Sequence, residues 1–266
     1  MGRREMSELV KISVDGKFGV VTLSAPGRRN ALSPEMRNEV SNGLRRLTRL
    51  NECKVIILTG VDGNFCAGGD MKSSEIEENG PDPLRTFSNA LPLQDIIRAI
   101  ATGPKPVVAA VEGCAFGAGF SLAAACDLVV AADGAKFCAS FGKVGLLPDT
   151  GLLWSLPRRV GVVKAKQILL SARIVEADEA IEIALADESA PEGGALNVAL
   201  ELAKSMASIA PLATAAIRSV LGRGMTDLET ILAAEREIQP LLTLSNDYSE
   251  GRGAFIQRRL PEFKGN

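Results

Sequence analysis

Short runs of apolar residues, each followed by a glycine-rich or polar turn, recur through the first half of the chain. These runs predict strands over residues 11–14, 19–23, 55–59, 106–111 and 128–131. Between them lie stretches in which apolar residues return every three or four positions, which is typical of amphipathic helices. The alternation of apolar strands with helices predicts an α/β core of mostly parallel sheets covered by helices.

The helical pattern continues to dominate after the last predicted strand. The first helix has a clear start, because Ser33, Pro34 and Glu35 supply an N-cap, a first-turn proline and an early acidic residue. The predicted helices cover residues 34–50, 84–101, 120–125, 157–170, 176–186, 196–209, 211–221 and 227–244. A strand-like run covers residues 135–144, and the polar residues 75–83 predict a mobile loop. We divide the chain into a core at residues 1–205 and a helical region at residues 206–266.

Composition and charge restrict the class of protein. The chain has 266 residues, 46% hydrophobic and 23% charged, which is typical of one globular domain with or without an appendage. Its 30 Lys and Arg residues and 32 Asp and Glu residues give a net charge of −2, so the overall charge favours neither nucleic acid nor an anionic membrane as a partner. The longest apolar stretch, residues 114–126, is shorter than the roughly 20 residues of a membrane span.

The cysteines and the amino terminus indicate a compartment. Five cysteines occur without a paired spacing, which favours reduced thiols and argues against a metal site. The first residues lack the apolar segment of a secretory signal. We therefore expect a cytoplasmic protein.

The chain contains no histidine. This excludes Ser-His-Asp and Cys-His nucleophilic sites, and every mechanism in which an imidazole acts as general acid or base. If the protein is an enzyme, its proton chemistry depends on carboxylates, lysines, the single tyrosine or water.

Two glycine-rich loops directly follow predicted strands. The first is Phe65-Cys66-Ala67-Gly68-Gly69-Asp70, and the second runs from Val111 to Ser121 and leads into a helix. Each loop alone is consistent with an ordinary turn between a strand and a helix. Glycines also let a backbone present N–H groups to a ligand, and a helix N-terminus adds the positive end of its dipole. Two such loops together are what a two-donor oxyanion hole requires.

A dinucleotide site is the rival interpretation of the second loop. The spacing of Gly113, Gly117 and Gly119 does not match the G-x-G-x-x-G fingerprint. No acidic residue ends a following strand at the distance that this fingerprint requires. The pattern therefore argues against dinucleotide binding.

Asp149 is the candidate proton carrier. It lies between Pro148 and Thr150 in a segment with Leu146, Leu147, Leu152 and Leu153. We expect these apolar neighbours to desolvate the carboxyl group, which would suit a general base or acid in a chain without histidine. The alternative is an Asx-turn or a helix N-cap without a chemical role.

Four ordered motifs, spread over nearly the whole chain, resemble the crotonase (enoyl-CoA hydratase/isomerase) superfamily. They occupy residues 26–36, 65–72, 111–128 and 250–264. The resemblance implies a spiral of ββα units with a helical C-terminal trimerisation region, in a homotrimer or a dimer of trimers. It also implies an acyl-CoA thioester substrate, whose enolate two backbone N–H groups stabilise, and no cofactor beyond the coenzyme A of the substrate.

The resemblance assigns roles to individual residues of this chain. The two N–H donors would be those of Ala67 and Ala118. Because a basic pair lies beside a motif loop in an acidic protein, we also expect Arg28 to meet the phosphates and the backbone near Asp70 and Met71 to meet the adenine. The substrate-binding residues that it implies are Arg28, Cys66, Ala67, Gly68, Gly69, Asp70, Met71, Gly117, Phe141, Phe263 and Lys264.

The chain departs from the family's hydratases, which use two glutamates to activate water. Ser121 and Phe141 occupy those two places here, and neither can act as a base. Some isomerases of the family carry an aspartate on the next loop, where Asp149 falls. Residues 141–149 are most similar to the ring-opening isomerases of phenylacetate degradation.

We therefore expect an acyl-CoA isomerase with Asp149 as the catalytic proton shuttle. Two alternatives stay open. One is a hydratase that uses another acid, such as Asp70 or Glu112. The other is an acyl-CoA-binding protein that has kept the fold without catalysis.

Overall fold

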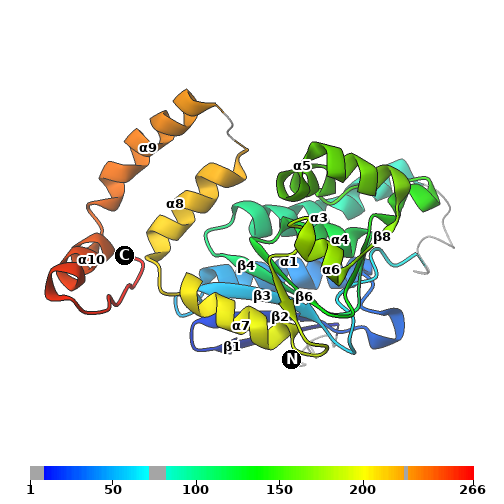
Figure 1. The fold of residues 1–266 in the computed structure, drawn as a ribbon, viewed down its shortest axis with the longest axis horizontal. Helices are drawn as coiled ribbons and strands as arrows, with labels where there is room; N and C mark the ends of the chain where they lie inside the picture. Colours follow the sequence, from blue (N-terminus) through cyan, green and yellow to red (C-terminus); the bar gives the residue numbers. More distant parts are fainter. Residues whose placement is uncertain (1–8, 72–81, 225–226) are drawn as a thin grey trace, which may run out of the picture.

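A six-stranded sheet forms the centre of the molecule in a computed structural model that describes residues 9–71, 82–224 and 227–266 (Figure 1). Its strands, in spatial order, are β1 (Val10–Asp15), β2 (Phe18–Leu23), β3 (Val55–Gly60), β4 (Val107–Val111), β6 (Leu128–Ala132) and β9 (Glu188–Ala190). β1 is antiparallel to β2, and the remaining neighbours are parallel. The predicted α/β class is confirmed.

The mobile loop expected over residues 75–83 lies, except for its last two residues, outside the described residues.

A second, three-stranded sheet includes part of the second glycine-rich loop. Its strands are β5 (Cys114–Phe116), β7 (Lys136–Cys138) and β8 (Ile174–Glu176), in the order β5-β7-β8. No sequence pattern predicts β5, β8 or β9, because strands of three residues are too short to show a period of two. The strand predicted over residues 135–144 is wrong in its second half, which forms the 3-10 helix η2 (Ser140–Val144).

Helices cover both faces of the main sheet, and the last three helices of the chain extend beyond it (Figure 1). The helices are α1 (Pro34–Arg49), α3 (Pro83–Thr102), α4 (Ala118–Ala125), α5 (Leu152–Ser171), α6 (Ala177–Glu182), α7 (Ala195–Met206), α8 (Pro211–Gly222), α9 (Leu228–Leu242) and α10 (Asn246–Gln257), with the short 3-10 helix η1 (Pro26–Arg28) before α1. The predicted start of α1 is confirmed, since Ser33 Oγ accepts a hydrogen bond from Met36 N at 3.3 Å. α5 begins five residues before its prediction and is interrupted at Gly161, where the backbone turns to φ 74°.

The parallel strands are buried on both faces, which is why they read as continuous apolar runs. In β3, Ile56 and Leu58 pack with the apolar side chains of α1 and α3. Val55 and Ile57 point to the other face and pack with three buried alanines of α7. The sheet is therefore fixed between two helical layers, and the ends of its strands are held rigidly.

The last three helices extend from this body as an arm (Figure 1). α8 packs on α3, and its Arg218 forms an ion pair with Asp127 and donates to the carbonyl of Gly103 at 2.7 Å. α9 contains no buried residue. α7 ends at Met206, and the division of the chain at residue 205 stays a prediction.

The described residues contain no single helix that is long and apolar enough to cross a membrane. α7 and α8 reach that length and composition only when they are taken together, and they are bent by 106° at their junction.

Candidate active site

The two glycine-rich loops lie against each other where β3 and β4 end. Cys66 N donates to Cys114 O at 2.8 Å, and Phe116 N donates to Cys66 O at 2.9 Å. A ligand at the carboxyl ends of parallel strands is the usual arrangement in open α/β sheets. The hydrogen bonds between the two loops are consistent with the expectation that both contribute to one site.

Glycine is required where the loops touch. A Cβ on Gly68, whose φ is +100°, would lie 2.8 Å from the Phe116 carbonyl and 3.5 Å from Ala118 N. A Cβ on Gly119 would lie 2.2 Å from the Cys66 carbonyl, far closer than any real contact. The glycines therefore allow the first loop to lie directly on the N-terminus of α4.

The structure does not support Ala67 as a donor to a substrate. Its N–H donates to the carbonyl of Arg29 at 2.9 Å. Two residues later, Gly69 is exposed, and in the part of the chain that the structure describes its N–H has no acceptor. The sequence motif places the loop correctly, but it does not reveal which N–H the neighbouring η1 turn occupies.

Ala118 retains the position that was predicted for the second donor. It is the first residue of α4, and the first helical bond runs from Ser121 N to Gly117 O at 3.0 Å. The N–H of Ala118 therefore has no acceptor within the helix, and it lies at the positive end of the helix dipole. Gly117, with φ +50°, forms the turn into the helix.

Asp149 lies beside this helix N-terminus. The hydroxyl of Ser121 donates to the Asp149 carbonyl at 3.0 Å, and Thr150 Oγ1 donates to the Asp149 carboxylate at 2.8 Å. The expectation of a buried carboxyl is wrong for the single chain, because Asp149, Leu146 and Leu147 are all exposed. Hydrogen bonds, rather than burial, hold this carboxylate.

Arg37 is a charged residue of this region that no sequence motif indicates. Its Nε donates to Leu32 O at 3.1 Å, and a Cβ on Gly69 would lie 3.6 Å from its Nη2. Burial lowers the pKa of Arg37, and the carboxylate of Asp149 is the strongest of the charges that oppose this effect. The guanidinium therefore lies next to Gly69 and within the field of Asp149.

The turn before α1 fastens the first loop in place. The buried side chain of Asn30 accepts from Ala25 N at 2.9 Å and donates to the carbonyls of Val61 and Asn64 at 3.0 and 2.7 Å. Arg28, from the same turn, forms an ion pair with the buried carboxylate of Asp70. The structure thus ties Arg28 to the first loop, and its expected contact with the phosphates stays a prediction.

Several other predicted site residues lie on or beside the two loops. Met71 is 59% exposed at the end of the first loop, while the side chain of Phe141 is buried in η2. Cys66 is fully buried, and burial raises the pKa of its thiol to about 12. Its sulfur is therefore a packing group, and only its backbone is placed to contact a ligand.

Glu112, the candidate acid of the hydratase alternative, has a structural task. Its carboxylate accepts from Gly193 N at 3.1 Å and from Ala195 N at 2.9 Å, and so caps the start of α7. Asp70, the other candidate acid, is buried and paired with Arg28. Both carboxylates are thus engaged within the protein.

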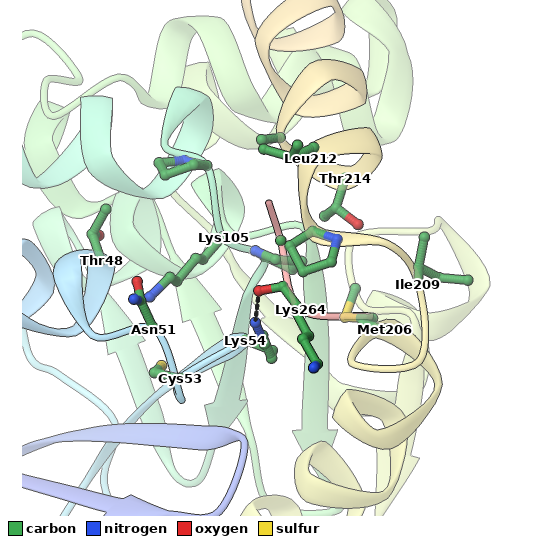
Figure 2. Close-up of a pocket in the computed structure, with 15 residues that line it drawn as sticks. Thr48, Asn51, Cys53, Lys54, Lys105, Met206, Ile209, Leu212, Thr214 and Lys264 are labelled. Atoms are coloured by element: carbon green, nitrogen blue, oxygen red, sulfur yellow. Dashed lines mark hydrogen bonds between the residues drawn. The ribbon is translucent and has the colours of Figure 1, made fainter. Parts of the chain in front are cut away.

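Phe263 and Lys264 do not join the site in the single chain. The tail folds back on α10, where Lys264 N donates to Asp247 at 2.7 Å, and the Lys264 carbonyl accepts from Lys54 Nζ at 3.2 Å. Figure 2 shows this contact beside a cavity of about 170 Å³. Lys54 lies just before the six-residue strand β3, and the first loop follows the other end of that strand. The contact between Lys264 and Lys54 is therefore about 20 Å, the length of the strand, from the first loop.

Comparisons with known proteins agree over almost the whole chain. A model of the enoyl-CoA hydratase/isomerase family matches residues 15–266. The 1,2-epoxyphenylacetyl-CoA isomerase of Escherichia coli (strain K12) is 33% identical over 261 residues, which cover 98% of this chain and 100% of the relative. The 2,3-dehydroadipyl-CoA hydratase of the same organism is 34% identical with the same coverage. A crystal structure of an enoyl-CoA hydratase from Polaromonas sp. JS666 has a TM-score of 0.88 at 35% identity, and covers 96% of this chain and 99% of that chain.

Proposed function

Because the chain belongs to the enoyl-CoA hydratase/isomerase family, we propose that it is an acyl-CoA isomerase in which Asp149 carries the proton. The relatives include both an isomerase and a hydratase at nearly equal identity, so their names do not decide between the two activities. The decision rests on the side chains of this site.

The observation that carries the proposal is the hydrogen bond from Ser121 Oγ to the Asp149 carbonyl. In the position where the family's hydratases are expected to hold a glutamate, a serine instead ties the Asp149 loop to α4. This bond holds the backbone of Asp149 beside the helix whose first N–H is the proposed second donor. Phe141, at the other glutamate position, offers no proton acceptor.

The proposed reaction moves one proton and adds no atom. The Asp149 carboxylate takes a proton from the carbon α or γ to the thioester, and the electron pair of that C–H bond forms the enolate. Asp149 then returns the proton to a different carbon. General acid–base catalysis by one positioned carboxyl group contributes about 10²–10⁴-fold in rate.

The enolate oxygen is held by two backbone N–H groups, and we assign them to Gly69 and Ala118. This revises the sequence-based assignment of the first donor, because the N–H of Ala67 donates to Arg29. The exposed N–H of Gly69 and the first N–H of α4 flank the point where Gly68 meets Ala118. Removal of one such donor typically costs about 10²–10³-fold in rate.

The acyl group is proposed to be unsaturated and largely apolar. Leu146, Leu147 and Leu153 surround Asp149 in the sequence and have large exposed fractions of 53%, 72% and 49%. Such side chains favour an apolar ligand. The name of the E. coli isomerase makes 1,2-epoxyphenylacetyl-CoA the first candidate substrate, and a 3-enoyl-CoA is the second.

We further propose that the protein works as a homotrimer or a dimer of trimers. The arm exposes apolar side chains along its length, including Leu228, Leu241, Phe255 and Leu260. Exposed patches of this kind mark association surfaces. Assembly would also let the tail of one subunit, with Phe263 and Lys264, reach the coenzyme A of another.

Incubation with a small panel of acyl-CoAs in ¹⁸O-labelled water tests the proposed function. The panel contains 1,2-epoxyphenylacetyl-CoA, a 3-enoyl-CoA and a 2-enoyl-CoA, and mass spectrometry follows the products. We expect rearranged or double-bond-shifted products of unchanged mass. Uptake of ¹⁸O by the 2-enoyl-CoA would support the hydratase alternative, and binding without turnover of any member would support the non-catalytic alternative.

A further inference from the structure

Arg37 is held beside the proposed oxyanion donor by the protein itself. It lies in the first turns of α1, and two of its three guanidinium nitrogens have backbone acceptors: Nε donates to Leu32 O at 3.1 Å and Nη1 to Asn89 O at 3.4 Å. The third, Nη2, lies next to Gly69, where an added Cβ would be 3.6 Å away. Within the described residues Nη2 has no acceptor, so it is available to the site.

No carboxylate in the part of the chain that the structure describes forms an ion pair with Arg37. No carboxylate of the described residues lies within 4 Å of its guanidinium, although the group is half-buried. Three carboxylates face the guanidinium: Asp149 from the loop before α5, Asp70 from the loop after β3, and Glu35 from α1. The thiol of Cys66 faces it as well and is neutral. Asp70 is paired with Arg28, and Glu35 accepts from Ser33 Oγ at 2.7 Å. Asp149 accepts only from Thr150 Oγ1 at 2.8 Å among the described residues, and of these carboxylates it has the strongest effect on Arg37.

We infer that Arg37 is a charge-stabilising residue for the enolate, which it serves from a fixed place beside Gly69. The inference rests on the proposed function and deepens it. Before the reaction, the negative charge of the site is on Asp149. When the proton moves, the substrate C–H bond breaks, Asp149 becomes neutral, and the charge passes to the thioester oxygen at Gly69.

A fixed cation near Asp149 and near the thioester oxygen stabilises the negative charge on either group, before and after the proton transfer. The guanidinium does not need to reorganise, because two backbone carbonyls already hold it. Its partial burial strengthens the interaction, since charges are screened less away from bulk water. Arginine is suited to this place because it stays protonated even where burial lowers its pKa.

Binding of two acyl-CoAs that differ in their ability to form an enolate tests this inference. Acetoacetyl-CoA ionises to an enolate with a distinct near-ultraviolet absorbance, whereas butanoyl-CoA has the same chain length and does not. The variants are Arg37→Met, which removes the charge, and Arg37→Lys, which keeps it. Arg45→Met changes an exposed arginine on the same helix and serves as the control.

We expect wild type and Arg45→Met to bind acetoacetyl-CoA as the enolate. Arg37→Met should lose roughly 10²-fold in affinity for acetoacetyl-CoA, while its affinity for butanoyl-CoA changes less than about threefold. The pH at which half of the bound acetoacetyl-CoA is enolate should move upward in Arg37→Met and partly return in Arg37→Lys. Butanoyl-CoA binding shows in each case that the variant is folded.

Two results would overturn the inference, and they are distinguishable. If Arg37→Met binds acetoacetyl-CoA as the enolate with wild-type affinity, the role of Arg37 is wrong and the proposed isomerase is untouched. If wild type itself binds acetoacetyl-CoA only in its neutral form, the enolate site is wrong, and the proposed mechanism fails with it. Should Arg37→Met not fold, a weakened enolate affinity in a folded Arg37→Gln variant supports the inference, and an unchanged one overturns it.

Discussion

A single hydroxyl group orients the carboxylate on which the proposed chemistry depends. Thr150 Oγ1 donates to Asp149 at 2.8 Å, and Thr150 itself has φ 53°, which is unusual for a β-branched residue. Strained backbone of this kind is kept only where the surrounding structure determines it, and it is common at functional sites. We interpret the strain as the cost of placing the hydroxyl on the carboxylate.

Replacement of Thr150 by valine should slow catalysis without abolishing binding. A hydrogen bond to a charged group is worth about 1.5–3 kcal/mol, so Thr150→Val should lower kcat by about tenfold or more while KM stays within about twofold. Thr150→Ser keeps the hydroxyl and should remain close to wild type. Equal kcat values for the valine variant and wild type would show that Thr150 does not orient Asp149.

The sequence predicts which loops form the site, but it does not predict every backbone N–H group and side chain that they place there. Asp149 and Ala118 stand out because they lie in recognisable motifs. The first donor could not be predicted, because the η1 turn uses the N–H of Ala67 and leaves that of Gly69 exposed. Arg37 belongs to an ordinary amphipathic helix, and only the packing of α1 on the first loop reveals its place.

Among the elements, α8 connects the core to the arm through one buried guanidinium. Arg218 is 6% exposed, pairs with Asp127 and donates to backbone carbonyls at the end of α3. Burial raises the pKa of Asp127, and the charge of Arg218 acts in the opposite direction. The contact therefore holds two elements of the core and one of the arm together.

Loss of Arg218 should destabilise the protein markedly. Arg218→Met removes the ion-pair partner of the partly buried Asp127 carboxylate and leaves it the hydrogen bond from Val107 N, and breaking such a pair typically costs about 3 kcal/mol or more. Urea unfolding at one fixed protein concentration measures the change in free energy of unfolding. Arg223→Met, at an exposed arginine just after the same helix, is the control and should differ by less than about 0.5 kcal/mol. A similar small change for Arg218→Met would contradict this role of α8.

The tail should detach from α10 in acid. Arg259 lowers the pKa of Glu250 to about 2 through a side-chain hydrogen bond, and Glu262 N also donates to this carboxylate at 2.9 Å. A lowered folded pKa means that the stabilisation is fully present above about pH 4.5 and is lost as the pH falls towards 2. Amide hydrogen exchange at Glu262 should accelerate over that range beyond its intrinsic pH dependence, because this amide donates to the Glu250 carboxylate. In Glu250→Gln the Glu262 amide should exchange quickly already at neutral pH, and unchanged protection in this variant would refute the contact.

The apolar pattern predicts elements well only where they are long enough to show a period. The runs that became β1 to β4 and β6 are confirmed, as is the N-cap of α1. The three-residue strands β5, β8 and β9 depend on pairing with distant segments, which no local pattern contains. The break of α5 at Gly161 is likewise a backbone feature that helical spacing does not reveal.

For the whole molecule, the arm raises the question of assembly. Its middle helix, α9, has no buried residue, although Leu228, Leu232 and Leu241 lie along it. Meanwhile Phe263 and Lys264 are separated from the proposed site of their own chain by the length of the central sheet. Both features are explained if subunits associate through their arms.

Light scattering should give a particle of about 84 kDa, three times the 28.0 kDa chain, or twice that mass. The double variant Leu228→Asp with Leu232→Asp should reduce the mass to that of one chain and weaken coenzyme A binding, because each tail would lose its neighbour. Glu237→Lys, at an exposed polar position of the same helix, should leave the assembly intact. A wild-type protein that shows only a 28.0 kDa species would contradict the proposed assembly.

The turnover of Asp149→Asn is the most direct test of the proposed mechanism. Asparagine keeps the shape of the side chain and its hydrogen bond from Thr150, but it cannot accept and return a proton. With the acyl-CoA that wild type isomerises, kcat should fall by about 10²–10⁴-fold, while calorimetric affinity for that acyl-CoA stays within about threefold. An Asp149→Asn variant that isomerises at the wild-type rate would contradict the account.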